Sequence, residues 1–156
     1  MDTIKIGQRL AQARLWLTGA GHVLDLAIRL YIANVFFSAG LTKIRDWSST
    51  LALFQDEYRV PLLSPQLAAF AGTFGELFFP VLLALGVATR LSALALLGVN
   101  IMAVVSYWHV LHELEPALAQ HFFWGVLLLV TLLHGPGKLA LDNFIWPKAW
   151  RPAARP

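Results

Sequence analysis

An acidic side chain stands in the middle of a long apolar stretch of this sequence. Glu76 lies about ten residues into the segment 66–88, and Arg29 lies about one turn inside another apolar segment, 24–42. Ionisable groups cost free energy in hydrocarbon, so they usually face a protein interior and mark function. We expect Glu76 to handle protons, with Arg29 reaching it if the two helices touch. A structural ion pair that fixes the register of the helices is the alternative.

Two asparagines also fall at central depth in apolar segments. Asn34 lies in 24–42 and Asn100 in 91–108. Amide side chains at such positions hydrogen-bond across neighbouring membrane helices, so we expect both to join helices. Lys43 shares a helical stripe with Arg29 at spacings of four and three residues, and we expect it to anchor the helix end and mark the rim of a cavity.

Three histidines gather near one end of the expected helices, with Glu113 and Glu115 beside them. His109 and His112 are three residues apart and could share a helical face with a copper or zinc ion, to which His121 would add a ligand. Histidine beside acidic residues is common at membrane interfaces, so we expect no metal site. The chain has no cysteine, which excludes disulfides, thiolate nucleophiles and cysteine-bound iron–sulfur clusters.

The elements that must position these residues follow from composition. Of 156 residues, 58% are hydrophobic and 13% are charged, against roughly 25% charged in soluble domains. A soluble domain of this size could not bury so much apolar surface, which excludes a soluble enzyme or a nucleic-acid-binding module. Four stretches can cross a bilayer, at 24–42, 66–88, 91–108 and 117–133. We predict an all-α integral membrane four-helix bundle over residues 22–145.

The flanking segments differ from the bundle. Residues 1–21 alternate basic and apolar side chains, which predicts an amphipathic helix in the membrane interface. Residues 146–156 form a basic C-terminal tail. Lysine and arginine are more frequent on the side that holds both termini and the turn 88–90, so both termini are predicted to be cytoplasmic. The loop 45–65 is predicted to contain a short surface helix before Pro61.

Three segments carry a resemblance to a known family. They are RLYIANVFFSAGLTKI (29–44), FQDEYRVPLLSPQLAAFAGTFGELFFPVLLALGVATR (54–90) and HGPGKLALDNF (134–144). Their order and spacing resemble the DoxX family over about residues 24–145. The resemblance implies a multi-pass protein of the bacterial inner membrane, associated with redox or sulfur metabolism. Arg29, Lys43, Glu76, Arg90 and Asp142 match the polar pattern of the family.

Two functions follow from the resemblance. In the first, the chain is the membrane subunit of a quinone-linked redox or thiol-stress system, since some relatives are described as part of a thiosulfate:quinone oxidoreductase. A quinone would bind between the spans, and Glu76 would carry the accompanying proton. The candidate ligand-binding residues are Arg29, Lys43, Glu76, Arg90 and Asn100.

In the second, the chain is a non-enzymatic scaffold or a small-molecule or metal-handling component. It would accompany iron-dependent enzymes that modify metal-binding peptides under copper or other metal stress. In the first function the chain is part of an enzyme system, whereas in the second it has no catalytic role; the sequence leaves both open. The expected partners are the lipid bilayer and a protein that supplies or accepts electrons, with a homo-oligomer left open and no nucleic acid.

Overall fold

The computed structural model describes residues 2–145, and that part of the chain contains helices but no strand. Four helices are long: α1 (Asp2–Arg45), α3 (Pro65–Leu85), α4 (Thr89–Ser106) and α6 (Glu115–His134). Three are short: α2 (Trp47–Asp56), α5 (Trp108–Leu111) and α7 (Asp142–Ile145). The predicted all-α class is therefore confirmed. The predicted tail, 146–156, lies outside the described residues.

The long helices provide the predicted membrane spans. Four segments are long and apolar enough to cross a bilayer: Trp16–Arg45, Pro65–Leu85, Thr89–Ser106 and Glu115–His134. Large apolar side chains cover their outer faces, among them Phe70, Phe122 and Leu133. In water such a surface would be unfavourable, whereas in lipid it needs no partner. The four-span prediction is confirmed.

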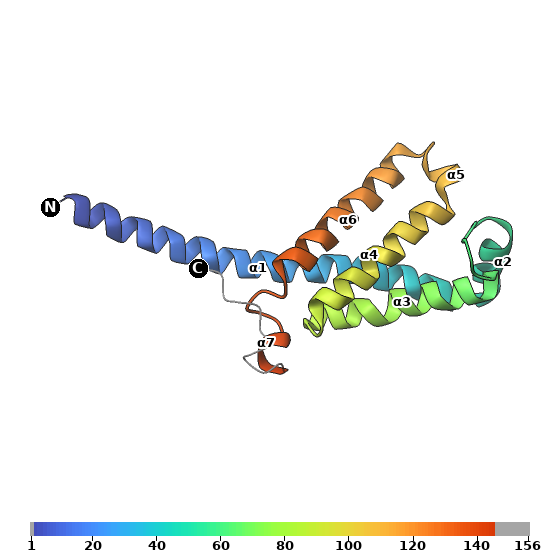
Figure 1. Cartoon of the computed structure of the whole chain (residues 1–156), viewed down its shortest axis with the longest axis horizontal. Coiled ribbons are helices and arrows are strands. Elements are labelled where there is room, and N and C mark those ends of the chain that lie inside the picture. Colours follow the sequence, from blue (N-terminus) through green and yellow to red (C-terminus); the bar gives the residue numbers. More distant parts are fainter. Residues whose placement is uncertain (1, 146–156) are drawn as a thin grey trace.

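The N-terminal segment is continuous with the first span. The helix α1 runs for 44 residues without a break, and Figure 1 shows its first part extending well beyond the other helices. The predicted boundary at 21/22 therefore does not coincide with a turn or loop. The location of residues 2–21 in the membrane interface stays a prediction.

The bundle is assembled by neighbouring pairs of helices. α1 packs along α3, α3 along α4, and α4 along α6, and Figure 1 shows α1 and α3 running side by side. Ile32, Phe36, Leu83, Leu96 and Leu128 form the main buried cluster between them. Gly40 allows a close approach, because a Cβ there would lie 2.8 Å from Leu77 Cγ. Small residues at such contacts are typical of membrane helix pairs.

The turn between α3 and α4 is closed by a carboxylate from the end of the described chain. Gly86 has a φ of 71° and Ala88 a φ of 45°. Asp142 accepts hydrogen bonds from the Ala88 amide (2.7 Å), the Thr89 amide (2.9 Å) and the Thr89 hydroxyl (2.7 Å). A carboxylate is favourable at a helix N-terminus because the amides there lack helical partners. Asp142 therefore caps α4.

The predicted short helix in the loop after α1 is present as α2. Asp46 caps it by accepting hydrogen bonds from the Ser49 hydroxyl (2.6 Å), the Ser49 amide (3.0 Å) and the Ser48 hydroxyl (2.7 Å). These hydrogen bonds, those from Ser49 foremost, lower the pKa of Asp46 to about 2. Phe54 of α2 packs against Ala68 and Ala69 of α3. This contact folds α2 back over one end of the bundle.

Candidate functional site

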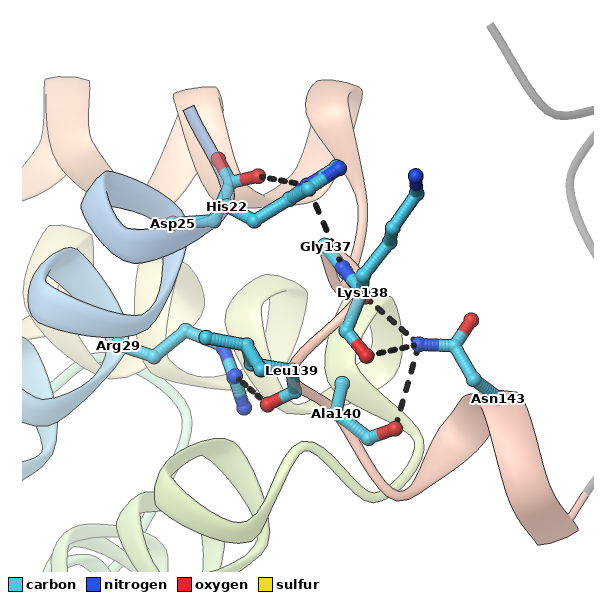
Figure 2. A network of polar contacts seen from close by, with 8 residues as sticks. All are labelled: His22, Asp25, Arg29, Gly137, Lys138, Leu139, Ala140 and Asn143. Carbon is cyan, nitrogen blue, oxygen red and sulfur yellow. Dashed lines mark hydrogen bonds and ion pairs between the residues drawn. The ribbon is translucent and has the colours of Figure 1, made fainter. Parts of the chain in front are cut away.

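The buried arginine of α1 does not meet Glu76, so that part of the sequence-based hypothesis is wrong. Arg29 is 1% exposed, and its guanidinium donates to backbone carbonyls. Nη1 contacts Leu83 O (3.2 Å) and Ala84 O (3.3 Å), and Nη2 contacts Leu139 O (2.5 Å). Figure 2 shows the side chain reaching from α1 to the segment that follows α6.

The register of α1 against α3 explains this placement. Gly40 lies level with Leu77, whereas Arg29 lies level with Gly86. Arg29 precedes Gly40 by eleven positions, which is about 16 Å along a helix at 1.5 Å per residue. An arginine side chain cannot span that distance. The shared helical stripe was predicted correctly, but Arg29 is at the wrong depth to reach Glu76.

The surroundings of Arg29 form a polar network at one end of the bundle. Asn143 donates to the carbonyls of Gly137 (2.7 Å), Lys138 (3.1 Å) and Ala140 (3.2 Å). The Lys138 amide donates to His22 Nδ1 at 3.5 Å, as Figure 2 shows. These contacts attach the loop after α6 to α1 and to the α3–α4 turn. We call Arg29, His22, Asn143 and the segment 137–140 the inner clamp.

Glu76 is paired with Lys43 instead. Lys43 Nζ lies 2.7 Å from Glu76 Oε1 and 2.5 Å from Oε2. The Glu76 residue is 8% exposed, and the Lys43 side chain is 21% exposed. Lys43 follows Gly40 by one helical turn, so it lies at the depth of Glu76 on the antiparallel neighbour. The predicted carboxylate is thus held by the cation that the sequence assigned to the rim.

The ion pair forms part of the wall of a cavity. The cavity has a volume of about 520 Å³, which is within the range of small-molecule sites. It lies toward the end of the bundle that carries α2 and α5. Most of its wall is apolar, and its lining includes Ala39, Lys43, Phe54, Tyr58, Ala68, Gly72, Glu76, Val99, Met102, Tyr107, His121 and Trp124.

Two tyrosines that sequence reasoning missed cover this cavity. The ring centroids of Tyr58 and Tyr107 are 5.1 Å apart, and the Tyr107 hydroxyl donates to Glu57 Oε2 at 3.3 Å. The Arg59 amide donates to Ser106 O at 2.9 Å, which ties the loop after α2 to the end of α4. Burial is the main cause that raises the pKa of Tyr58, so its hydroxyl stays protonated.

The two asparagines have different environments. Asn100 is 4% exposed; its Nδ2 donates to His121 O at 2.9 Å, and its Oδ1 lies 2.9 Å from His121 Nδ1. It therefore joins α4 to α6, as predicted. Asn34 is exposed on α1, so the prediction that it joins helices is wrong within residues 2–145. Its side chain lies on the face of α1 that turns away from the buried Ala33 and Phe36.

The remaining candidates lie away from the cavity or do not converge. Arg90 is exposed at the α3–α4 turn, where Nη2 donates to Leu133 O at 3.4 Å. The His109 ring packs on Tyr107, and the His112 ring stacks on Trp108. Among the described residues, no group of three or more His, Asp or Glu side chains could hold a metal ion. A site built from His109, His112 and His121 is therefore not supported.

Comparison with known proteins found a matching family model and a similar protein. The DoxX family model matches residues 24–109, a range that contains both Lys43 and Glu76. An uncharacterized protein of Haemophilus influenzae (strain ATCC 51907 / DSM 11121 / KW20 / Rd) is 32% identical over 130 residues, covering 77% of this chain and 82% of the relative. No solved structure matches the chain.

Proposed function

Because this chain belongs to the DoxX family of membrane proteins, we propose that it is the membrane component of a quinone-linked redox system. The ring of a lipid-soluble quinone would bind in the cavity that contains the Lys43–Glu76 pair. One observation carries this proposal: an ion pair lies in the wall of a largely apolar, ligand-sized cavity inside a membrane bundle. An ionisable group inside a membrane-spanning segment is a candidate functional residue, because its burial costs free energy.

The cavity fits the chemistry of a quinone. The volume of about 520 Å³ accommodates a substituted ring, and apolar walls such as Val99 and Met102 suit the ring face and an alkyl tail. A bound quinone supplies two-electron, two-proton redox chemistry. Lys43 can donate a hydrogen bond to a ligand oxygen, and Glu76 can hold a proton close to it. The small side chains of Gly72 and Ala68 leave the space beside the pair open.

The source of electrons is a protein partner. The chain has no cysteine, so it cannot itself exchange electrons with thiols through a dithiol pair. A partner that oxidises a sulfur compound or a thiol would deliver electrons to the cavity. The chain is a multi-pass protein of the bacterial inner membrane in this scheme, with both termini cytoplasmic. The cavity then faces the outer half of the bilayer.

The proposal is tested by quinone binding to purified protein in detergent or nanodiscs. Breaking a buried pair on one side alone risks unfolding, so the main variant is the double substitution Lys43→Met with Glu76→Gln. Titration with a decyl-substituted benzoquinone, followed by tryptophan fluorescence, should show saturable binding by the wild type. The double variant should bind at least about tenfold more weakly, because it lacks the ammonium donor of Lys43 and the carboxylate of Glu76.

Two further variants complete the experiment. Gly72→Leu should also weaken binding, since its side chain would project toward Phe54 in the cavity wall. Arg90→Gln changes a charge outside the cavity and should bind as the wild type does. Absence of saturable binding by the wild type, or equal binding by all variants, would overturn the proposal. The non-enzymatic scaffold alternative would then take its place, with residues 46–60 as the docking surface to mutate first.

A further inference from the structure

His121 is a second polar group of the cavity that the proposed function does not use. It lies on α6 and lines the cavity, whereas Lys43 and Glu76 come from α1 and α3. Its ring packs edge-on against Trp124, with centroids 5.0 Å apart. The ring orientation is therefore held from one side by an aromatic contact. From the other side it is held by Asn100.

The two hydrogen bonds of Asn100 fix which ring nitrogen of His121 carries a proton. The backbone oxygen of His121 can only accept, so the Asn100 atom that contacts it at 2.9 Å must be the amide nitrogen. The other end of the amide is then the oxygen Oδ1, which can only accept. It lies 2.9 Å from His121 Nδ1, so Nδ1 must be the donor.

This arrangement leaves Nε2 as a free acceptor. In a neutral imidazole one nitrogen donates and the other accepts, so a proton on Nδ1 leaves a lone pair on Nε2. Nε2 has no hydrogen-bond partner among residues 2–145. The largely apolar lining of the cavity provides few groups that could satisfy it. Nε2 is accessible from the cavity that His121 lines, so a donor group on a bound molecule can reach it.

We propose that His121 Nε2 accepts a hydrogen bond from a hydroxyl group on the ligand ring, and that Asn100 is the positioning residue that holds His121 in this state. The inference rests on the proposed function, because it assigns a ligand class to the same cavity. The ligand is a ring that carries a hydroxyl. Within a quinone couple, this geometry favours the reduced, dihydroxy form over the oxidised form, whose oxygens only accept.

The test compares two stable ligands whose ring oxygen carries either a donor proton or a methyl group. 4-Pentylphenol carries a hydroxyl, and 4-pentylanisole carries a methyl ether at the same position. The dissociation constants are measured by isothermal titration calorimetry on the detergent-solubilised full chain. The ratio of the constant for the ether to that for the phenol gives the contribution of the hydroxyl donor to binding. A single neutral hydrogen bond corresponds to roughly a five- to tenfold preference for the phenol in the wild type.

Variants assign this preference to His121. His121→Phe keeps a ring at the position but has no acceptor, and should reduce the ratio to about one. Asn100→Leu should reduce it in part, because the imidazole is no longer held in one tautomer. Phe122→Leu on the neighbouring lipid-facing position is the matched control and should keep the wild-type ratio. A wild-type ratio near one, or a ratio unchanged by His121→Phe, would overturn the inference.

A spectroscopic measurement separates positioning from general structural support. The ¹⁵N chemical shifts of labelled histidine distinguish a protonated Nδ1 from a protonated Nε2. The His121 signal, identified by its loss in His121→Phe, should show a protonated Nδ1 in the wild type and a mixture of tautomers in Asn100→Leu. A pure Nε2-protonated signal in the wild type would overturn the inference whatever the binding data.

Failure of the inference is distinguishable from failure of the proposed function. Equal binding of phenol and ether, together with saturable quinone binding that depends on Lys43 and Glu76, would remove the role of His121 alone. Binding of neither the ring ligands nor the benzoquinone would remove both. Preferential binding of the phenol with no quinone binding would keep the hydroxyl-accepting site and remove the redox assignment.

Discussion

Asn34 and Asn100 bear the same side chain within membrane spans, yet their energetics should be opposite. Asn100 is buried and satisfies both ends of its amide on α6. Asn34 is exposed on α1 within the candidate span Trp16–Arg45, so we expect it to face lipid in the single chain. A polar amide that faces hydrocarbon without a partner is unfavourable, whereas interhelical hydrogen bonds in membranes contribute about 0.6 kcal/mol on average and up to about 1.7 kcal/mol.

The same substitution at both positions measures this difference. Asn100→Leu should lower the free energy of unfolding by roughly 1–2 kcal/mol, since the α4–α6 bonds are lost. Asn34→Leu should leave it unchanged or raise it, since an apolar side chain is better solvated by lipid. Unfolding in SDS, followed by circular dichroism, provides both values. Marked destabilisation by Asn34→Leu would instead mean that Asn34 has a partner outside the single chain, such as a second copy.

For individual residues, the sequence predicted correctly that Glu76 and Asn100 are buried. It did not predict that Lys43 is the partner of Glu76. Glu76 and Asn100 were identified because apolar surroundings make such side chains conspicuous. The partner of Glu76 depends on the relative depth of two helices, which Gly40 sets through its close contact with Leu77. The sequence shows a glycine at position 40 but does not show which residue of α3 lies against it, so the register could not be predicted. Tyr58 was missed as a cavity residue because a tyrosine in a loop after a short helix resembles an ordinary interfacial residue.

The inner clamp holds three elements together through one side chain. Arg29 of α1 donates to the last turns of α3 and to the segment between α6 and α7. The carbonyls at the end of a helix lack helical partners, so a buried guanidinium with five donors suits this position. Asp142, the first residue of α7, adds the cap on α4. The clamp therefore fixes the α3–α4 turn against α1.

Substitution of Arg29 should loosen this end of the bundle. Arg29→Met should lower the free energy of unfolding by roughly 3 kcal/mol, since several buried carbonyls lose a charged donor. Arg29→Lys should recover part of this loss, because one ammonium cannot reproduce the planar fork. The exposed Arg90→Met is the control and should change stability by less than about 0.5 kcal/mol. Equal stability of the wild type and Arg29→Met in SDS unfolding would contradict the clamp.

Three of the four spans were predicted to within a few residues and the short helix α2 was predicted as well, whereas the start of the first span and the helix α7 were not. α7 consists of Asp142–Ile145 and is too short for a periodic pattern. Its position depends on bonds to distant residues such as Ala88. The predicted division between residues 21 and 22 does not coincide with an end of the helix. The helix continues through Gly19 and Gly21, because a glycine costs a helix only about 1 kcal/mol and does not end it.

The two ends of the helix bundle are built differently. One end is closed by the inner clamp, and the cavity is lined in part by residues of α2 and α5 at the other end; Figure 1 shows α2 and α5 at the end of the bundle away from α7. The two ends of the bundle also differ in their charged residues. Basic residues outnumber acidic ones in the turn 88–90 and the segment 134–145 taken together, which carry Arg90, Lys138 and Asp142, whereas Arg45 and Arg59 are accompanied by Asp46, Asp56 and Glu57. The charge bias predicts that the cavity end faces away from the cytoplasm.

Single cysteines test this orientation directly, because the chain has none of its own. Gln55→Cys lies exposed on α2 at the cavity end, and Lys138→Cys lies exposed at the clamp end. The test uses cells whose inner membrane is closed and whose outer membrane does not block the reagent. A membrane-impermeant maleimide should label Gln55→Cys in these cells. It should label Lys138→Cys only after the inner membrane is permeabilised, since the bilayer separates the two ends. The unmodified chain should stay unlabelled. The reversed pattern would place the cavity on the cytoplasmic side. Labelling of both variants in intact cells would contradict the four-span arrangement, because three crossings (α3, α4 and α6) lie between the two positions and put them on opposite sides of the membrane.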